Sequence, residues 1–228
     1  MSIFDIIGPV MVGPSSSHTA GAVRIGNVGR KLLGDDVKKA VIEFHGSFLM
    51  TGKGHGTDRA LVAGLLGMKV DDSSIPRSFE IAEERGLEYH MEAVDLGDAH
   101  PNSVRMTLFS ESSKMVTVIA ASIGGGRIEI CEVDGLRTKF SGDYPTLIIN
   151  NEDRPGLVKD VTFLLANNQV NIGSMQVHRS SRGENAVMVL ECDQEVEKKV
   201  IQKLEATEGI NKVTYLSLVD EKKEGAYV

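Results

Sequence analysis

The sequence predicts an α+β protein with two domains, and three observations support this. Turn-forming residues cluster at 141–145, between two apolar patterns typical of strands. Before this cluster, helical patterns come first and strand patterns later, as in layered α+β folds rather than doubly wound parallel sheets. After it, strands and helices alternate in the order βαββαβ, which is the ferredoxin-like arrangement. We therefore expect domains at 1–142 and 143–219 and a charged tail at 220–228.

The first domain is expected to begin with helices around a single strand. Apolar periodicity predicts helices at 15–33, 57–66 and 76–85, and a strand at 39–48. Alternating apolar residues then predict a series of strands at 88–94, 103–110, 115–122 and 127–133. The glycines at 124–126 are typical of a hairpin turn, so the last two strands should be antiparallel neighbours.

The second domain shows a more regular pattern. A short strand is expected at 146–150, and Pro155 is well placed to begin a helix that ends near residue 167. In this helix Leu157, Val161 and Leu165 lie on one apolar face. Strands at 170–179 and 186–191, a helix at 195–207 and a strand at 213–219 complete the predicted sheet.

Composition argues against several classes of function. Apolar residues make up 41% and charged residues 25% of the 228, which is ordinary for a soluble globular protein. The formal charge is −7 and there is no run of Lys or Arg, so nucleic acid is not an expected partner. No run reaches the roughly 18 apolar residues of a membrane span, and the N-terminus lacks the basic segment of a secretion signal. We expect a cytoplasmic protein with no membrane partner.

The two cysteines do not predict a metal site or a disulfide. Cys131 and Cys192 lie far apart in the sequence, with no cysteine or histidine at metal-ligand spacing around either one. Both lie in apolar patterns typical of strands, so we expect free thiols. The chain itself is therefore predicted to hold no metal.

The first candidate site is the run of Ser15, Ser16, Ser17, His18 and Thr19, at the start of the first predicted helix. A helix start presents unpaired N–H groups and a partial positive charge, and the hydroxyls add further donors. A carboxylate or phosphate would be stabilised there. The alternative is an ordinary serine N-cap, although capping requires one serine rather than three.

The second candidate site contains Lys53, Gly54, His55 and Asp58, and it is expected to form a glycine-rich loop after a strand. Glycines would let the backbone approach a ligand closely, and Lys53 and His55 supply charge and proton-transfer capacity. The spacing differs from that of a phosphate-binding P-loop, so nucleotide binding is not favoured. The alternative is a flexible turn without a ligand.

With both motifs in view, the first domain resembles the β region of the iron–sulfur L-serine dehydratases, which in turn is similar to the allosteric substrate-binding domain of some phosphoglycerate dehydrogenases. The resemblance rests on the run at 15–19, on Ser47 together with the run at 51–58, and on the turn at 100–102. It implies deamination of L-serine to pyruvate and ammonia. It also implies a [4Fe–4S] cluster held by a separate α subunit, because such a cluster needs three or four thiolates.

The same resemblance implies roles for this chain's residues. Ser15, Ser16, Ser17, His18 and Thr19 would bind the substrate carboxylate. Lys53, Gly54 and Asp58 would also bind the substrate, and His55 would be the catalytic residue. A different class of function also fits the sequence: a non-catalytic amino-acid-sensing regulatory protein.

The run at 151–157, at the junction of the first strand and helix, and the run at 170–172, at the start of the second strand, carry a second resemblance. On these residues the second domain resembles the ACT family of small-molecule-binding regulatory domains. The resemblance implies self-association and binding of a small effector, often an amino acid, at the shared interface. The residues that would contact this regulatory ligand are Asp153, Arg154, Pro155, Gly156, Leu157, Asn171 and Ile172. The alternative is a domain that only dimerises.

Overall fold

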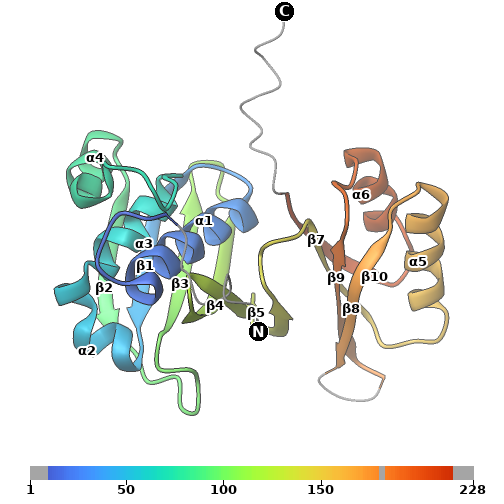
Figure 1. Cartoon of the computed structure of the whole chain (residues 1–228). Helices are drawn as coiled ribbons and strands as arrows, with labels where there is room; N and C mark the ends of the chain where they lie inside the picture. Colours follow the sequence, from blue (N-terminus) through green and yellow to red (C-terminus); the bar gives the residue numbers. More distant parts are fainter. Residues whose placement is uncertain (1–9, 180–182, 218–228) are drawn as a thin grey trace, which may run out of the picture. The chain divides into compact units, whose positions relative to one another are not determined.

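A computed structural model of the chain describes residues 10–179 and 183–217, apart from the side chain of Lys53. The predicted tail at 220–228 lies outside the described residues. The chain forms two compact units, Met1–Leu136 and Arg137–Val228, and each is described by itself. Figure 1 shows a sheet with helices in both units.

The first unit is built on a mixed sheet. Its strand order is β2-β1-β3-β4-β5-β6 among the described residues. β1 and β2 are parallel, whereas β1–β3, β3–β4 and β4–β5 are antiparallel pairs. The strands are β1 (Val37–Phe44), β2 (Glu88–Ala93), β3 (Ser103–Ser110), β4 (Met115–Gly124), β5 (Arg127–Val133) and β6 (Leu136–Phe140). The antiparallel pairs dominate this sheet, which confirms the α+β class.

The helices of this unit come mostly before β2 (Figure 1). They are the π-helix η2 (Ser16–Gly21), α1 (Ala22–Leu33), α2 (Gly46–His55), α3 (Thr57–Leu65), the short 3-10 helix η3 (Ile75–Arg77) and α4 (Ser78–Glu84). α1 packs on the sheet, where Gly29 lies against Met106 and Leu108 of β3. α1 and α3 cross at Gly26 and Gly64, whose missing side chains let the two backbones touch.

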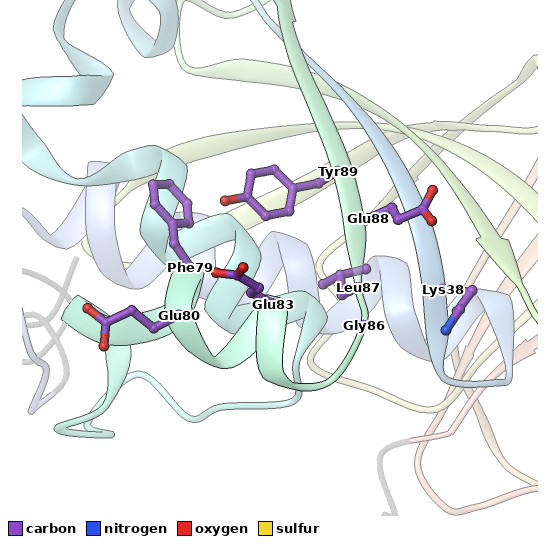
Figure 2. A pocket seen from close by; sticks show the side chains of 8 residues that line it. All are labelled: Lys38, Phe79, Glu80, Glu83, Gly86, Leu87, Glu88 and Tyr89. Atoms are coloured by element: carbon purple, nitrogen blue, oxygen red, sulfur yellow. The ribbon is translucent and has the colours of Figure 1, made fainter.

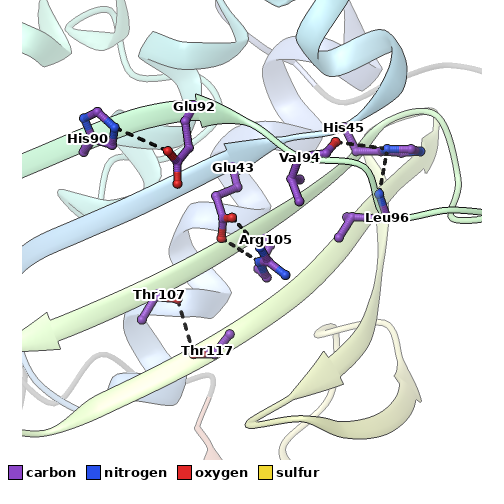
Figure 3. Close-up of polar contacts among 9 residues, drawn as sticks. All are labelled: Glu43, His45, His90, Glu92, Val94, Leu96, Arg105, Thr107 and Thr117. Atoms are coloured by element: carbon purple, nitrogen blue, oxygen red, sulfur yellow. Dashed lines mark hydrogen bonds and ion pairs between the residues drawn. The ribbon is translucent and has the colours of Figure 1, made fainter.

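The opposite face of the sheet carries polar side chains. Successive side chains of a strand point to opposite faces, so Arg105 and Thr107 of β3 lie on the face away from α1. Figure 3 shows the ion pair between Arg105 and Glu43 of β1 there. The hydrogen bonds from Arg105 lower the pKa of the Glu43 carboxyl below its ordinary value. The hydroxyl oxygens of Thr107 on β3 and Thr117 on β4 lie 3.3 Å apart and form a hydrogen bond between the strands.

The second unit has the predicted βαββαβ order. Its sheet runs β10-β7-β9-β8, which is the ferredoxin-like arrangement. The elements are β7 (Thr146–Glu152), α5 (Leu157–Asn167), β8 (Ile172–Arg179), β9 (Asn185–Cys192), α6 (Lys198–Glu205) and β10 (Ile210–Leu216). Leu157, Val161 and Leu165 of α5 are buried against strand residues such as Met188 and Leu190. The predicted apolar face of this helix is confirmed.

Two expectations for the first unit are wrong. The strand expected at 39–48 ends at Phe44, and the expected glycine-rich loop belongs to α2, which continues to His55. Gly56 then takes the left-handed conformation (φ 70°) that ends α2 and lets α3 begin at Thr57. The glycines of this segment therefore permit a sharp junction between two helices. Strand β6 was also not predicted, since its five residues are too few for a clear pattern.

Candidate functional site

The start of η2 separates the three serines into two kinds. Ser15 is the N-cap, and its hydroxyl accepts a hydrogen bond from the N–H of His18 at 3.1 Å. Ser16 and Ser17 are half-buried, and their hydroxyls make no hydrogen bond with the described residues. The N–H groups of His18 and Thr19 both donate to Ser15, to its hydroxyl and its carbonyl oxygen, so the first-turn N–H groups that remain are those of Ser16 and Ser17. Ser15 thus caps the helix, while Ser16 and Ser17 offer both hydroxyl and N–H donors to a ligand.

The two sequence motifs meet through His18 and His55. The centroids of their imidazole rings lie 5.0 Å apart. The two motifs are nevertheless distant in the sequence, since Thr19 and His55 are 36 positions apart. The hydroxyl of Thr19 donates to the carbonyl oxygen of His55 at 3.3 Å, and this ties the start of η2 to the end of α2. His55 is exposed, whereas Thr19 is buried. The structure therefore brings both predicted histidines into one site.

His18 is held by side chains of α2. Its Nε2 atom lies 3.0 Å from Thr51 Oγ1 and 3.3 Å from Ser47 Oγ. Its ring also meets the edge of Phe48 at 5.2 Å between centroids. Burial, followed by the nearby His55, lowers the pKa of His18 below its ordinary value, so the neutral form is favoured. The role of Ser47 and Thr51 was missed, although both lie in the motif that carries the resemblance.

The turn before β3 fixes the position of α2. The carbonyl oxygen of Pro101 accepts hydrogen bonds from the N–H groups of Ser47 at 2.7 Å and Phe48 at 3.4 Å. Gly46 lies so close to Pro101 that a Cβ atom there would be 2.6 Å from the carbonyl oxygen. The turn thus satisfies the first donors of α2 and holds the helix that carries His55.

The other residues predicted for the substrate site are not brought to His18 and His55 by any contact that the structure shows. The side chain of Lys53 lies outside the described part of the chain. Gly54 lies on the exposed face of α2, with nothing within 4 Å of the position of a Cβ. Asp58 lines a cavity of about 200 Å³ with Phe48, Leu49 and others, and its lining does not include the two histidines. Their roles in binding stay predictions.

A larger cavity, of about 570 Å³, lies elsewhere in the first unit. Figure 2 shows Phe79 beside Tyr89 in this cavity, with Glu80, Glu83 and Glu88 around it. The two rings stack at 5.4 Å between centroids. None of its lining residues belongs to the predicted motifs, and three carboxylates would repel an anionic ligand. We therefore place the candidate site at the histidines and not in this cavity.

The residues predicted for the regulatory ligand fall into two groups in the second unit. In the loop between β7 and α5, the Asp153 carboxylate accepts the N–H of Gly183 at 2.9 Å and pairs with Arg179 at 3.4 Å. Arg154 donates to the carbonyl of Glu208 at 2.6 Å, and Leu157 is in the core. The Pro155–Gly156 turn is exposed and precedes the first N–H groups of α5.

The other group lies at the opposite end of the sheet. Ile172 of β8 pairs with Cys192 of β9, and Cys192 lies beside the start of β7. The β7–α5 loop follows the other end of β7, where Glu152 pairs with Asn185 of β9. Asn171, the residue before Ile172, donates a side-chain hydrogen bond to the carboxylate of Asp193. One chain alone therefore does not bring Asn171 and Ile172 together with the β7–α5 loop.

Asn151 near that loop was missed by sequence reasoning. Its side chain is 3% exposed, and its Oδ1 atom has no hydrogen-bond partner among the described residues. A buried amide oxygen without a partner is costly, and such atoms often face a ligand or water. The signal in the sequence was its place at the start of the run at 151–157, although Asn151 was not predicted to contact the regulatory ligand.

The thiols of this chain do not fit an iron–sulfur cluster. Cys131 and Cys192 lie in different units, and the described residues contain no group of three or more metal-ligating side chains. Burial, with Asp193 nearby, raises the pKa of the Cys192 thiol to about 11, so it does not supply a thiolate near neutral pH. We derive no chemical step through a cluster on this chain.

The fold and the site together define a class of protein: an α+β unit with paired histidines, joined to a unit with the ACT fold. The serine dehydratase beta chain family matches residues 2–95, and the ACT domain family matches residues 146–209. No helix of the described residues is long and apolar enough to cross a membrane.

Three relatives are similar over most of this chain. The probable L-serine dehydratase beta chain of Bacillus subtilis is 40% identical, covering 95% of this chain and 98% of that protein. The L-serine dehydratase beta chain of Peptoniphilus asaccharolyticus is 36% identical with the same coverage. D-3-phosphoglycerate dehydrogenase of Bacillus subtilis is 26% identical, covering 86% of this chain and 37% of that protein. This chain belongs to the serine dehydratase β chain family.

Proposed function

We propose that this chain is the β subunit of an L-serine dehydratase, which deaminates L-serine to pyruvate and ammonia together with an α subunit. The observation that carries the proposal is the meeting of His18 and His55 in one site, in a chain that matches serine dehydratase β chains along 95% of its length. The free hydroxyls beside His18 add donors suited to a carboxylate.

The proposed roles follow from the hydrogen-bonding groups and the exposed surface that each residue still offers to a ligand. Ser16 and Ser17 hold the substrate carboxylate through their hydroxyls and their own N–H groups, because the N–H groups of His18 and Thr19 are already bonded to Ser15. His55 acts on the reacting atoms, since it is exposed and lies within 5.0 Å of His18 between ring centroids. Fixing the carboxylate restricts the orientation of the substrate relative to His55.

The iron–sulfur cluster belongs to the α subunit in this proposal. Its support is the family resemblance together with the poor fit of this chain's two thiols. The β subunit contributes substrate positioning and regulation. It is therefore expected to be inactive alone.

The ACT unit is proposed to bind an amino-acid effector between two copies of the chain. The support is the placement of the two residue groups at opposite ends of one sheet. A ligand that touches both the β7–α5 loop and Asn171 needs a second copy to supply one of them. Self-association and effector binding are therefore linked in this proposal.

Co-expression with a neighbouring candidate α chain tests the function. The purified complex, handled without oxygen, should contain iron and form pyruvate from L-serine, whereas this chain alone should contain no iron and form none. A cluster bound in stoichiometric amount by this chain alone would contradict the subunit assignment. Binding of L-serine without an α partner or any pyruvate would favour the amino-acid sensor instead.

A further inference from the structure

The hydrogen bonds of Thr51 determine which nitrogen of His18 carries a proton. A threonine hydroxyl has one hydrogen to donate and two lone pairs to accept with. Thr51 Oγ1 donates that hydrogen to the carbonyl oxygen of Ser47, one turn earlier in α2, at 2.9 Å. The hydroxyl therefore has only lone pairs left for its other neighbours.

His18 Nε2 is one of these neighbours, at 3.0 Å from Thr51 Oγ1. Two lone pairs facing each other at this distance would repel, so the hydrogen between the two atoms must come from Nε2. The hydroxyl of Ser47, at 3.3 Å from Nε2, lies within reach of the same N–H. His18 is thus held with its Nε2 protonated.

The other ring nitrogen is then left as an acceptor. Burial and the neighbouring His55 lower the pKa of His18, so the ring is neutral near neutral pH. A neutral imidazole carries hydrogen on one nitrogen only, and here that nitrogen is Nε2. Both side-chain hydroxyls that contact the ring, those of Ser47 and Thr51, lie at Nε2. The lone pair of Nδ1 is available to a ligand.

We propose that Thr51 is a positioning residue that holds His18 in the neutral Nε2–H form, so that Nδ1 accepts a hydrogen bond from the α-ammonium group of the substrate. The identity of the ligand rests on the proposed function, whereas the protonation state rests on the hydrogen bonds alone. Nothing in the family resemblance assigns this role to Thr51.

The chemistry of an amino acid supports this division of the site. The carboxylate needs donors, which Ser16 and Ser17 offer, while the ammonium group has three donors and needs acceptors. The nearby acid Asp58 has its carboxylate oxygen bonded to the N–H of Arg59 at 2.8 Å and lines a different cavity. The Nδ1 atom of His18, the residue that follows Ser16 and Ser17 in η2, supplies the missing acceptor in this proposal.

Nuclear magnetic resonance on the full chain tests the protonation state without the α subunit. With ¹⁵N-labelled histidine at about pH 8, where histidine is neutral, the two ring nitrogens give distinct shifts with and without hydrogen. A His18→Gln variant identifies the signals. The wild type should show a protonated Nε2, and Thr51→Val should shift the ratio of the two forms by about fivefold, the value of one hydrogen bond. Thr51→Ser should restore it.

Thr162 provides a matched control. It makes the same bond to the carbonyl one turn earlier, from Oγ1 to Val158 at 2.9 Å, but it lies on α5 of the other unit. Thr162→Val should leave the His18 signals unchanged. A wild-type His18 protonated at Nδ1, or one that does not respond to Thr51→Val, would overturn the proposal.

Steady-state kinetics on the complex with the α subunit tests the role in binding. Thr51→Val should raise KM for L-serine by up to about fivefold, the factor by which the Nε2–H form is lost, and lower kcat much less, and Thr51→Ser should behave as wild type. An unchanged KM with the expected shift in the resonance signals would refute the ammonium contact. If no complex forms pyruvate, the proposed function fails while the resonance result still decides the protonation state.

Discussion

At the residue scale, the three serines at the start of η2 predict two different outcomes on substitution. In the complex, Ser16→Ala or Ser17→Ala should mainly raise KM for L-serine. Losing a hydrogen bond to a charged group costs about 1.5–3 kcal/mol, which is roughly tenfold to a hundredfold. Ser15→Ala is the matched control, because its hydroxyl caps the helix through His18. It should instead lower the free energy of unfolding by about 0.5–2 kcal/mol.

The same steady-state kinetics on variants of the two histidines should distinguish a role in binding from a role in chemistry. His55→Ala is expected to lower kcat by roughly 10²–10⁴-fold if His55 transfers a proton. His18→Ala should act mainly on KM, because its neutral ring serves as an acceptor. The opposite pattern, with kcat lost in His18→Ala alone, would exchange the two roles. Normal KM and kcat in every serine and histidine variant would leave both motifs as structural elements.

At the scale of elements, the crossing of α1 and α3 holds the site together, since η2 runs into α1 and α2 runs into α3. A Cβ on Gly64 would lie 2.2 Å from the carbonyl oxygen of Val23, so the helices would have to separate. We expect Gly64→Ala to lower the free energy of unfolding by about 1–3 kcal/mol, measured by urea denaturation.

Gly54→Ala in α2 is the control for helix propensity. Nothing lies within 4 Å of its Cβ position, so the variant should be as stable as wild type or up to about 1 kcal/mol more stable. A Gly64→Ala chain with the wild-type urea midpoint would show that the helices can shift without cost.

The elements also show what the sequence could and could not predict. The second unit was predicted in full because its apolar periods are clear, as in α5 with Leu157, Val161 and Leu165. α2 was not predicted because three of its ten residues are glycines and its start depends on Pro101, more than 50 residues away. The meeting of His18 with Thr51 follows from that helix, so this part of the site required the structure.

At the scale of the whole molecule, the chain combines the unit that carries the paired histidines with a unit that has the ACT fold. Residues 1–136 and 137–228 form separate compact units, and each has its own buried core. A chain that ends at Gly142 keeps β6 and every element before it. Such a chain is expected to fold alone, since cooperative units with their own cores usually do.

Removal of the ACT unit should therefore leave the substrate site intact and abolish the response to effector. We expect the chain ending at Gly142 to keep the ring signals of His18, because Ser47 and Thr51 remain, but to lose self-association in analytical ultracentrifugation. When this shortened chain is in complex with the α subunit, the rate of pyruvate formation at each L-serine concentration should no longer change with added amino acids. An unchanged oligomeric state together with an unchanged amino-acid response would show that Asp153–Leu157 and Asn171 serve no regulatory ligand. Loss of the His18 signals would instead show that the first unit depends on the second, because the same measurement reports on the fold of the site.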